Sequence, residues 1–210
     1  ASVDRSLQRL KTDYLDILLL HRPDPLMDGE EVADAFSTVQ AAGKVRFFGV
    51  SNFMPFQLDY LQGYLEVPLV VHQIRLSILA NSVIDSGQDG SPASNAQGTL
   101  EYCMAEDILV QAYSPLHKGY LGGRPVPDDD PDRERIERVA GCVAEIAEEA
   151  SVSREAIALA WLMHHPAGIQ PVIGTKNPDR IRATAEASTF EMSRDQWFRL
   201  YVAARGRDLP

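Results

Sequence analysis

An imidazole and two charged side chains follow an apolar run near the start of the sequence. In YLDILLLHRPDP, residues 14–25, four aliphatic residues at 17–20 precede His21, Arg22 and Asp24. Such a run is typical of a strand that is buried on both faces. An imidazole at its end suits hydrogen bonding to a substrate. The alternative is a structural role, in which His21 caps the strand end and Arg22 pairs with Asp24. The residues by themselves leave both open.

Three further apolar segments also end in polar residues. Ser51 and Asn52 follow VRFFGV, Gln73 follows LVVH, and Ser114 follows ILVQAY. Hydroxyl and amide groups both donate and accept hydrogen bonds, so they suit a polar ligand. The alternative for each residue is a hydrogen bond to nearby backbone. Polar groups gathered at the carboxyl ends of parallel strands form the active sites of (β/α)8 barrels.

The elements that must position these residues alternate between strands and helices. Strands are predicted at residues 14–20, 45–53, 69–78, 108–116 and 169–174, and helices at 30–42, 54–65, 98–106, 132–149, 153–165, from 178, and at 193–204. A short helix is predicted at the start of the chain, where Leu7 and Leu10, with Val3, form one apolar stripe. The helix at 132–149 has a second apolar stripe, formed by Ile136, Val139, Val143, Ile146 and Ala147. Ser153 suits a helix N-cap and Gly43 a helix end, whereas residues 79–97 are predicted to form a long loop. The crossovers are long enough for helices, so the strands are expected to be parallel and the class α/β. Only five strands are predicted, whereas a barrel has eight.

Composition excludes several classes of protein. The net charge of −10, from 30 acidic and 20 basic residues, argues against nucleic-acid binding. Cys103 and Cys142 are too far apart in sequence for a CxxC site, which predicts two reduced thiols. No apolar run is long enough to span a membrane and no signal peptide is apparent, so we expect a soluble cytoplasmic protein.

No metal site is predicted. The acidic run at 128–130 is interpreted as a solvated loop before a helix. His72, His117, His164 and His165 are interpreted as surface or strand-end residues.

Five blocks of the sequence resemble one known family in their order and spacing. They are SLQRLKTDYLDILLLHRPDP, GKVRFFGVSNF, QAYSPLHKGYL, ALAWLMHHP and PVIGTKNPDRI, and they resemble the aldo-keto reductase superfamily. The tract HRPDPLMDGEEVADAF and the ending QWFRLYVAARGRDLP most resemble bacterial YdhF-type oxidoreductases. The similarity covers nearly the whole chain.

The resemblance implies a (β/α)8 TIM barrel that binds NADP(H) and reduces carbonyls. The five predicted strands match strands 4 to 8 of that barrel, so residues 1–210 are expected to form a partial aldo-keto reductase domain with the C-terminal five βα units. The family's catalytic Asp, Tyr and Lys would lie before Ala1. His21 is then the catalytic residue that this chain supplies. Its imidazole would hydrogen-bond the substrate carbonyl oxygen and stabilise the charge that develops there.

The resemblance also assigns the cofactor-binding residues. Ser51, Asn52 and Gln73 match the positions that bind the nicotinamide carboxamide, and Tyr113 matches the aromatic residue that stacks on the nicotinamide ring. A role in the core is the alternative for Tyr113. The loop over the pyrophosphate is matched by Ser114, Leu116, Gly119 and Leu121.

The region that binds the 2′-phosphate is matched by Gly174, Thr175, Lys176 and Arg180. Arg and Lys suit a phosphate dianion, and the helix that Pro178 opens is expected to add backbone amide donors. The alternative is a solvated basic patch. Ala183 and Thr184 depart from the family's Glu-Asn, which bears on adenine contact and NADP preference.

The resemblance therefore predicts an NADPH-dependent oxidoreductase that acts on a small-molecule aldehyde or ketone, represented here by a catalytically incomplete fragment. The alternative is a non-catalytic nucleotide-binding or regulatory member of the same fold. Strands 14–20 and 169–174 would be the open edges of the partial barrel. Such edges favour self-association, pairing with a separate N-terminal piece, or aggregation.

Overall fold

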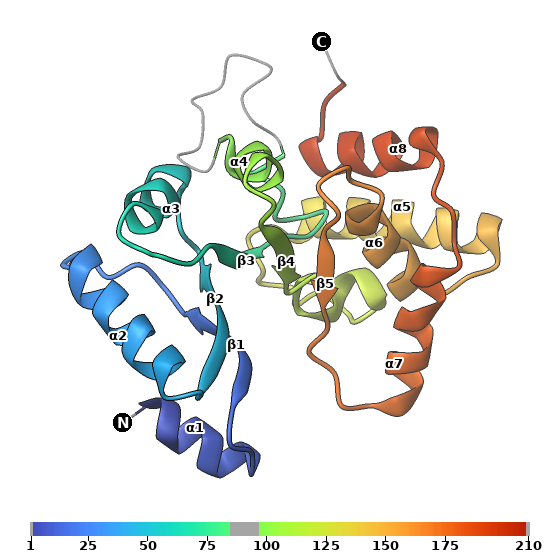
Figure 1. Ribbon diagram of the computed structural model, residues 1–210. Helices are drawn as coiled ribbons and strands as arrows, with labels where there is room; N and C mark the ends of the chain where they lie inside the picture. Colours follow the sequence, from blue (N-terminus) through green and yellow to red (C-terminus); the bar gives the residue numbers. More distant parts are fainter. Residues whose placement is uncertain (1, 85–96, 209–210) are drawn as a thin grey trace. The chain divides into compact units, whose positions relative to one another are not determined.

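The computed structural model describes residues 2–84 and 97–208 and confirms the α/β class (Figure 1). Its five strands form one sheet in the order β1-β2-β3-β4-β5. The chain divides into two compact units. Unit 1 comprises Ala1–Ile74 and Gly98–Val110, and unit 2 comprises Arg75–Gln97 and Gln111–Pro210.

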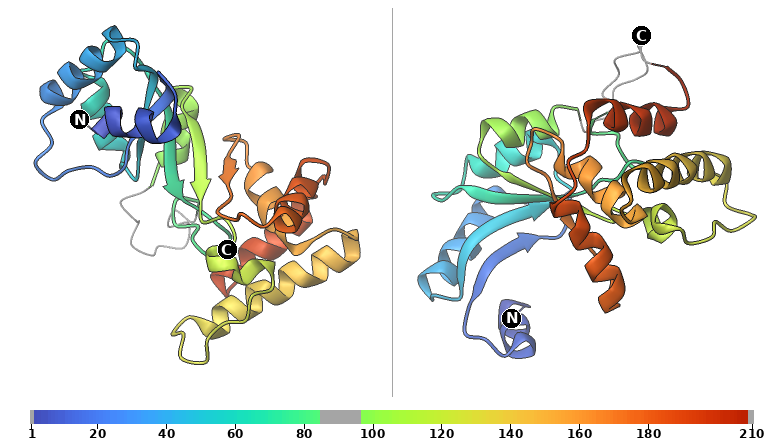
Figure 2. Two further views of the ribbon diagram at one scale, coloured as in Figure 1. Left: turned by 90° about the horizontal axis from the view of Figure 1, so that it is seen from below. Right: turned by 90° about the vertical axis from the view of Figure 1, so that its right-hand side faces the viewer.

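Unit 1 holds the first three strands with four helices. The strands are β1 (Leu15–Leu20), β2 (Val45–Ser51) and β3 (Leu69–Arg75), and the helices are α1 (Ser2–Leu10), α2 (Gly29–Ala41), α3 (Pro55–Gln62) and α4 (Thr99–Ala105). Both strand pairs, β1 with β2 and β2 with β3, are parallel, as the crossover lengths predicted (Figure 2).

Helix α2 packs on the sheet through an aromatic contact. The rings of Phe36 on α2 and Phe48 on β2 stack with their centroids 3.9 Å apart, and both side chains are buried. The helix ends as predicted, since Gly43 has φ +68° and its N–H donates to the carbonyl of Gln40. Gly49 allows β2 and β3 to approach, because a Cβ there would lie 2.4 Å from the backbone oxygen of Val71.

Strand β1 corrects one expectation. Burial on both faces was predicted, but no residue of Leu15–Leu20 is buried, and Ile17 retains 38% of its exposure. Among the described residues β1 has a neighbouring strand on one side only, so its apolar side chains lack the cover that a central strand receives. Leu10 of α1 is also exposed, at 64%, although it belongs to the predicted apolar stripe.

Unit 2 holds the last strand and the longest helix. Its elements are β5 (Gln170–Val172), α5 (Arg133–Ala150), α6 (Arg154–Met163), α7 (Pro178–Ala185), α8 (Arg194–Arg205) and the 3-10 turns His117–Gly122 and Glu186–Ser188, while β4 (Leu109–Tyr113) begins in unit 1 and ends in unit 2. Strands β4 and β5 are parallel. The apolar stripe predicted on α5 is confirmed, because Ile136, Val139, Val143, Ile146 and Ala147 are all buried.

Two tryptophans join α6 to α8. The rings of Trp161 and Trp197 stack at 5.0 Å with an interplanar angle of 7°. Each indole N–H donates to the backbone carbonyl of the other tryptophan, at 3.2 and 2.9 Å. The two large apolar groups are thereby buried without leaving either indole N–H unsatisfied.

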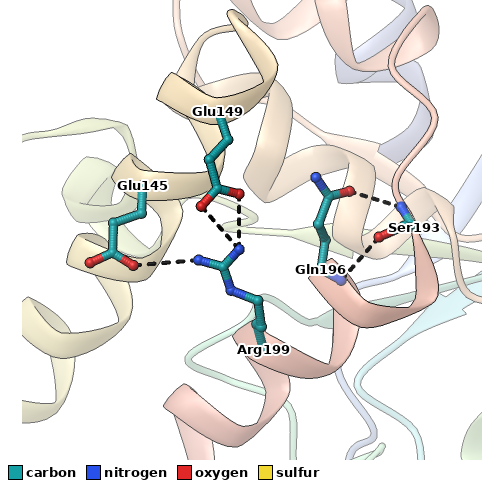
Figure 3. Close-up of polar contacts among 5 residues, drawn as sticks. All are labelled: Glu145, Glu149, Ser193, Gln196 and Arg199. Atoms are coloured by element: carbon teal, nitrogen blue, oxygen red, sulfur yellow. Dashed lines mark hydrogen bonds and ion pairs between the residues drawn. The ribbon is translucent and has the colours of Figure 1, made fainter.

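Polar contacts join α8 to α5 and cap the first turn of α8 (Figure 3). Arg199 donates to the carboxylates of Glu145 and Glu149 on α5, and its shortest contact with Glu149 is 2.9 Å. At the start of the helix, the Ser193 hydroxyl accepts from the N–H of Gln196, while the Gln196 side chain accepts from the N–H of Ser193. This capping box satisfies two amides that the helix leaves open.

Several boundaries and environments differ from the predictions. Strand β3 ends at Arg75 rather than 78, β4 ends at Tyr113 rather than 116, and β5 spans 170–172 rather than 169–174. Residues 85–96 of the predicted loop lie outside the described part of the chain. His72 was predicted at the surface or a strand end, but it lies within β3, which has a strand on each side, and it is fully buried.

Candidate functional site

The first group of predicted site residues lies in unit 1, at the carboxyl ends of β1, β2 and β3. His21 follows β1 directly, Ser51 is the last residue of β2, and Asn52 comes next. In the parallel pairing of β2 with β3, Ser51 lies opposite Gln73. The fold therefore brings these four predicted residues to one edge of the sheet, as the strand ends indicated.

Asn52 links the members of this strand-end group, which we define as His21, Ser51, Asn52 and Gln73. Its φ is +61°, a left-handed conformation that asparagine tolerates better than most residues. Its backbone N–H donates to the carbonyl of Gln73 at 3.0 Å. Its side-chain Nδ2 donates to the carbonyl of His21 at 3.3 Å and to the hydroxyl of Ser51 at 2.9 Å. The turn at Asn52 thus ties three strand ends together.

His21 leaves its side chain exposed while its backbone carbonyl is held by Asn52. The alternative structural role for His21, a cap at the strand end, included an ion pair between Arg22 and Asp24. No ion pair joins these two described residues, and Asp24 instead accepts from the backbone N–H of Leu26 at 2.9 Å. The backbone at His21 is therefore fixed, and its imidazole is accessible to a ligand.

The second group lies in unit 2, around a cavity of about 270 Å³. Its walls come from the segment after β4 and from the segment that leads from β5 into α7. The lining includes the predicted residues Ser114, Leu116, Gly119, Gly174, Thr175 and Arg180, together with Pro115, His117, Lys118, Ile173 and Thr184. Residues about 60 positions apart in sequence thus share one cavity, which we call the β4–α7 cavity.

The wall after β4 contains an unusual run of left-handed residues. His117, Lys118 and Gly119 have φ of +44°, +60° and +89°, and Ser114 has φ +58°. Only glycine adopts this conformation without cost, so the tertiary structure must hold the other three residues in it. The run turns the chain around the cavity, which the sequence predicted only through Gly119.

His117 is a lining residue that the sequence prediction missed. Its Nδ1 is buried and has no hydrogen-bond partner in the described structure. Burial lowers the pKa of His117, and the positive charges of Arg75, Lys118 and Arg135 act in the same direction. Its place directly after the YSPL segment was the signal that could have identified it.

On the opposite wall, the backbone amides at the start of α7 are not free, contrary to the prediction. The side chain of Asn177 accepts from the N–H groups of Asp179 and Arg180, at 2.8 and 3.4 Å, and Pro178 has no N–H. The N–H of Asn177 in turn donates to the hydroxyl of Thr175. The helix start is therefore capped by its own chain, and anion binding here depends on side chains rather than on backbone amides.

Three predicted residues do not line this cavity. Leu121 is fully buried, so its side chain belongs to the core of unit 2. Tyr113 is half-buried at the end of β4, and its carbonyl accepts from the N–H of Leu76. Lys176 is exposed beside the cavity-lining Thr175. Another cavity, of about 330 Å³ between α3 and α4 in unit 1, is lined by none of the predicted residues.

The β4–α7 cavity fits a phosphate-bearing ligand. Arg180 and Lys176 are exposed, and neither side chain has a hydrogen bond or ion pair with another described residue. A Cβ added at Gly174 would meet no atom within 4 Å, so the backbone there faces open space. Arg180 in the lining, Lys176 beside it and the open backbone at Gly174 suit a phosphate group.

Metal and membrane sites find no support in the described residues. No group of three potential metal ligands occurs among them, and both cysteines are free thiols. None of the described helices combines the length and apolar character that a membrane crossing requires.

Comparison with known proteins then decides the family. The model of the aldo/keto reductase family matches residues 1–203 of the 210. The chain belongs to the aldo/keto reductase family. It is 41% identical to the uncharacterized oxidoreductase YcsN of Bacillus subtilis and 40% identical to the oxidoreductase YdhF of Escherichia coli. Each alignment covers 100% of this chain and 64% of the relative. The resemblance identified from the five sequence blocks is confirmed.

A solved aldo/keto reductase has the same fold. The crystal structure of a thermostable aldo-keto reductase in complex with the inhibitor epalrestat superposes with a TM-score of 0.76 at 25% sequence identity. The superposition covers 96% of this chain and 64% of that one. The chain thus spans just under two thirds of the length of the relatives that it matches.

Proposed function

We propose that the chain is the cofactor-binding part of an NADPH-dependent reductase that acts on small aldehydes or ketones. It would supply the C-terminal five βα units of a (β/α)8 barrel. The observation that carries the proposal is the β4–α7 cavity, where residues matched to the family's pyrophosphate loop and 2′-phosphate region share one space. The proposal rests on residue matches and on this geometry together.

Each group of residues has its own proposed role. In unit 2, Ser114, Leu116 and Gly119 bind the pyrophosphate, and Thr175, Lys176 and Arg180 bind the 2′-phosphate. Gly174 permits close approach of the ligand to the backbone. His117 adds a neutral imidazole to this group.

In unit 1, Ser51, Asn52 and Gln73 bind the nicotinamide carboxamide. Tyr113, at the end of β4, stacks on the nicotinamide ring. The reduced nicotinamide supplies a hydride when it is bound.

His21 is the proposed catalytic residue of this chain. Its exposed imidazole would hydrogen-bond the substrate carbonyl oxygen, orient the carbonyl group and stabilise the negative charge that develops on oxygen. The assignment gives the chain an orienting group but no proton donor. General acid catalysis typically contributes ~10²–10⁴-fold in rate, so the 210-residue chain is expected to bind cofactor yet turn over slowly.

The test is a fluorescence titration of the 210-residue chain with NADPH, NADH and adenosine 2′,5′-bisphosphate. NADPH and the bisphosphate should bind, and NADH should bind more weakly because it lacks the 2′-phosphate. Absence of NADPH binding by the folded chain would refute the proposed function. In a parallel assay with NADPH and 4-nitrobenzaldehyde, turnover at ordinary enzymatic rates would show that the proton-donor argument is wrong.

A further inference from the structure

A buried histidine on β3 is adjacent to Gln73 of the strand-end group, and it has no role in the proposed function. His72 is on β3, next to Gln73, and is fully buried. Its Nε2 accepts a hydrogen bond from the backbone N–H of Phe53 at 3.1 Å. Phe53 follows Asn52 directly and is itself buried. The imidazole therefore fixes the backbone on one side of the left-handed turn at Asn52.

The other ring nitrogen of His72 faces a second buried group. Nδ1 lies 3.6 Å from the Sγ of Cys103 on α4, and Cys103 is fully buried as well. Because Nε2 accepts from an N–H, a neutral ring carries its proton on Nδ1, which then donates to the sulfur. One side chain thus connects the helix α4, the strand β3 and the turn after β2.

The chemistry of both groups is consistent with this neutral arrangement. Burial lowers the pKa of His72 to about 4 and raises the pKa of the Cys103 thiol to about 12. A protonated imidazole would present a second donor to the N–H of Phe53, and that hydrogen bond would be lost. At neutral pH the ring is uncharged and the acceptor is in place.

The turn that His72 supports carries the strand-end group. The N–H of Asn52 is bound by Gln73, and its Nδ2 is shared between His21 and Ser51. Losing the hydrogen bond at Phe53 would remove a backbone anchor directly after Asn52, whose left-handed conformation is unfavourable for a residue with a side chain. Its amide would then hold the carbonyl of His21 and the hydroxyl of Ser51 less firmly.

We propose that His72 is a positioning residue, which acts through the N–H of Phe53 to hold the turn at Asn52 in the geometry that binds the nicotinamide carboxamide. The carboxamide role rests on the proposed function, whereas support of the turn does not. His72 touches neither cofactor nor substrate in this role. Cys103 completes the support by satisfying the second ring nitrogen.

The test compares three substitutions at one position. In His72→Gln, the amide oxygen reaches the former position of Nε2 and keeps an acceptor for Phe53. In His72→Asn, which is shorter by one methylene, the amide reaches only toward the former position of Nδ1. His72→Leu removes both groups. Asn and Gln have the same functional group, so their difference isolates the hydrogen bond to Phe53 from polarity.

Two binding affinities distinguish a positioning role of His72 from a general loss of folded structure. NADPH affinity should fall by about 5- to 10-fold in His72→Asn and His72→Leu, and return to near wild type in His72→Gln, as expected for one lost hydrogen bond. Affinity for adenosine 2′,5′-bisphosphate, which lacks nicotinamide, should be unchanged in all three. Equal weakening of both ligands, or failure of His72→Gln to restore binding, would overturn the proposal.

Amide signals test the support of the turn without any ligand. In ¹⁵N spectra of the free chain, the Phe53 amide and the Asn52 side-chain amide should shift in His72→Asn and stay near wild type in His72→Gln. Unchanged signals in His72→Asn and His72→Leu would refute the positioning role. If the wild-type chain binds neither ligand, the proposed function is wrong, and these signals alone decide whether His72 holds the turn.

Discussion

The two groups of site residues are held in opposite ways. In unit 1, the strand-end group is tied by hydrogen bonds that centre on Asn52, and a buried imidazole supports the turn from behind. In unit 2, Lys176 and Arg180 are exposed and have no partner among the described residues. One group is organised before any ligand arrives, whereas the charges of the other stay in water until a ligand binds.

The difference follows from the chemistry that each group is proposed to recognise. A carboxamide is neutral and is distinguished only by the direction of its hydrogen bonds, so its partners must be fixed in advance. A phosphate dianion attracts flexible cations from several directions, and solvated Lys and Arg side chains avoid the cost of burying unpaired charge. Unit 1 should therefore be sensitive to geometry, and unit 2 to charge.

The largest expected effect concerns the stability of unit 1 at acidic pH. The pKa of His72 is lowered to about 4 in the fold, from an ordinary value of 6.5, so the unfolded chain takes up a proton that the folded chain does not. The free energy of unfolding should therefore fall as the pH falls from about 6.5 to about 4, by about 3 kcal/mol. Chemical denaturation of wild type and His72→Gln at several pH values measures the difference.

The variant provides the control for that loss, because carboxylates and His117 also titrate in acid and remain in both proteins. The pH dependence of stability in His72→Gln should be shallower over this range. If the free energy of unfolding depends on pH equally in both proteins, His72 does not titrate as a buried group. The proposed difference between unit 1 and unit 2 would then lose its main evidence.

The next effect tests the charges of unit 2. In Lys176→Ala combined with Arg180→Ala, NADPH affinity should fall by about 10²-fold, as expected for two charge-assisted contacts, while NADH affinity changes little. Arg182→Ala is the matched control. Arg182 lies on the same helix, but its guanidinium pairs with Asp179 at 2.7 Å. Equal loss of NADPH and NADH binding would assign Lys176 and Arg180 a structural role.

The smallest expected effects are on the stability of unit 2, and they come from two substitutions at α8 that should leave ligand binding unchanged. Ser193→Ala removes the N-cap of α8 and should lower the free energy of unfolding by about 1 kcal/mol. Arg199→Ala removes exposed ion pairs with α5 and should cost less than about 1 kcal/mol. Thermal unfolding measures both, and adenosine 2′,5′-bisphosphate should bind both variants like wild type. Weaker binding in either variant would mean that the β4–α7 cavity depends on how α8 packs.

Local signals in the sequence predicted much of this architecture. The spacing of five apolar residues predicted the buried face of α5, and Ser153 predicted the start of α6, where its hydroxyl accepts from the N–H of Ala156. Polar residues after apolar runs predicted which side chains would gather at the strand ends. These features depend on periodicity and on hydrogen bonds between residues close in sequence, so a short segment of the chain is enough to predict them.

The environments of particular residues were predicted less well. His72 was interpreted as a surface or strand-end residue but is fully buried, and the strand predicted at 14–20 was expected to be buried on both faces, whereas no residue of β1 is buried. The helix start at 178 was expected to offer amides, but Asn177 already binds them. In each case the environment depends on whether another segment packs against the residue or binds its polar group.

The sequence by itself determined the class of fold, the order of elements, the family and the types of side chain available for chemistry. Only the tertiary structure decided that His72 supports Asn52, that Leu121 belongs to the core, and that His117 joins a cavity with residues about 60 positions away. The physical reason is that periodicity fixes which face of an element is apolar. What covers that face, and which polar atom finds a partner there, is set by segments distant in the chain.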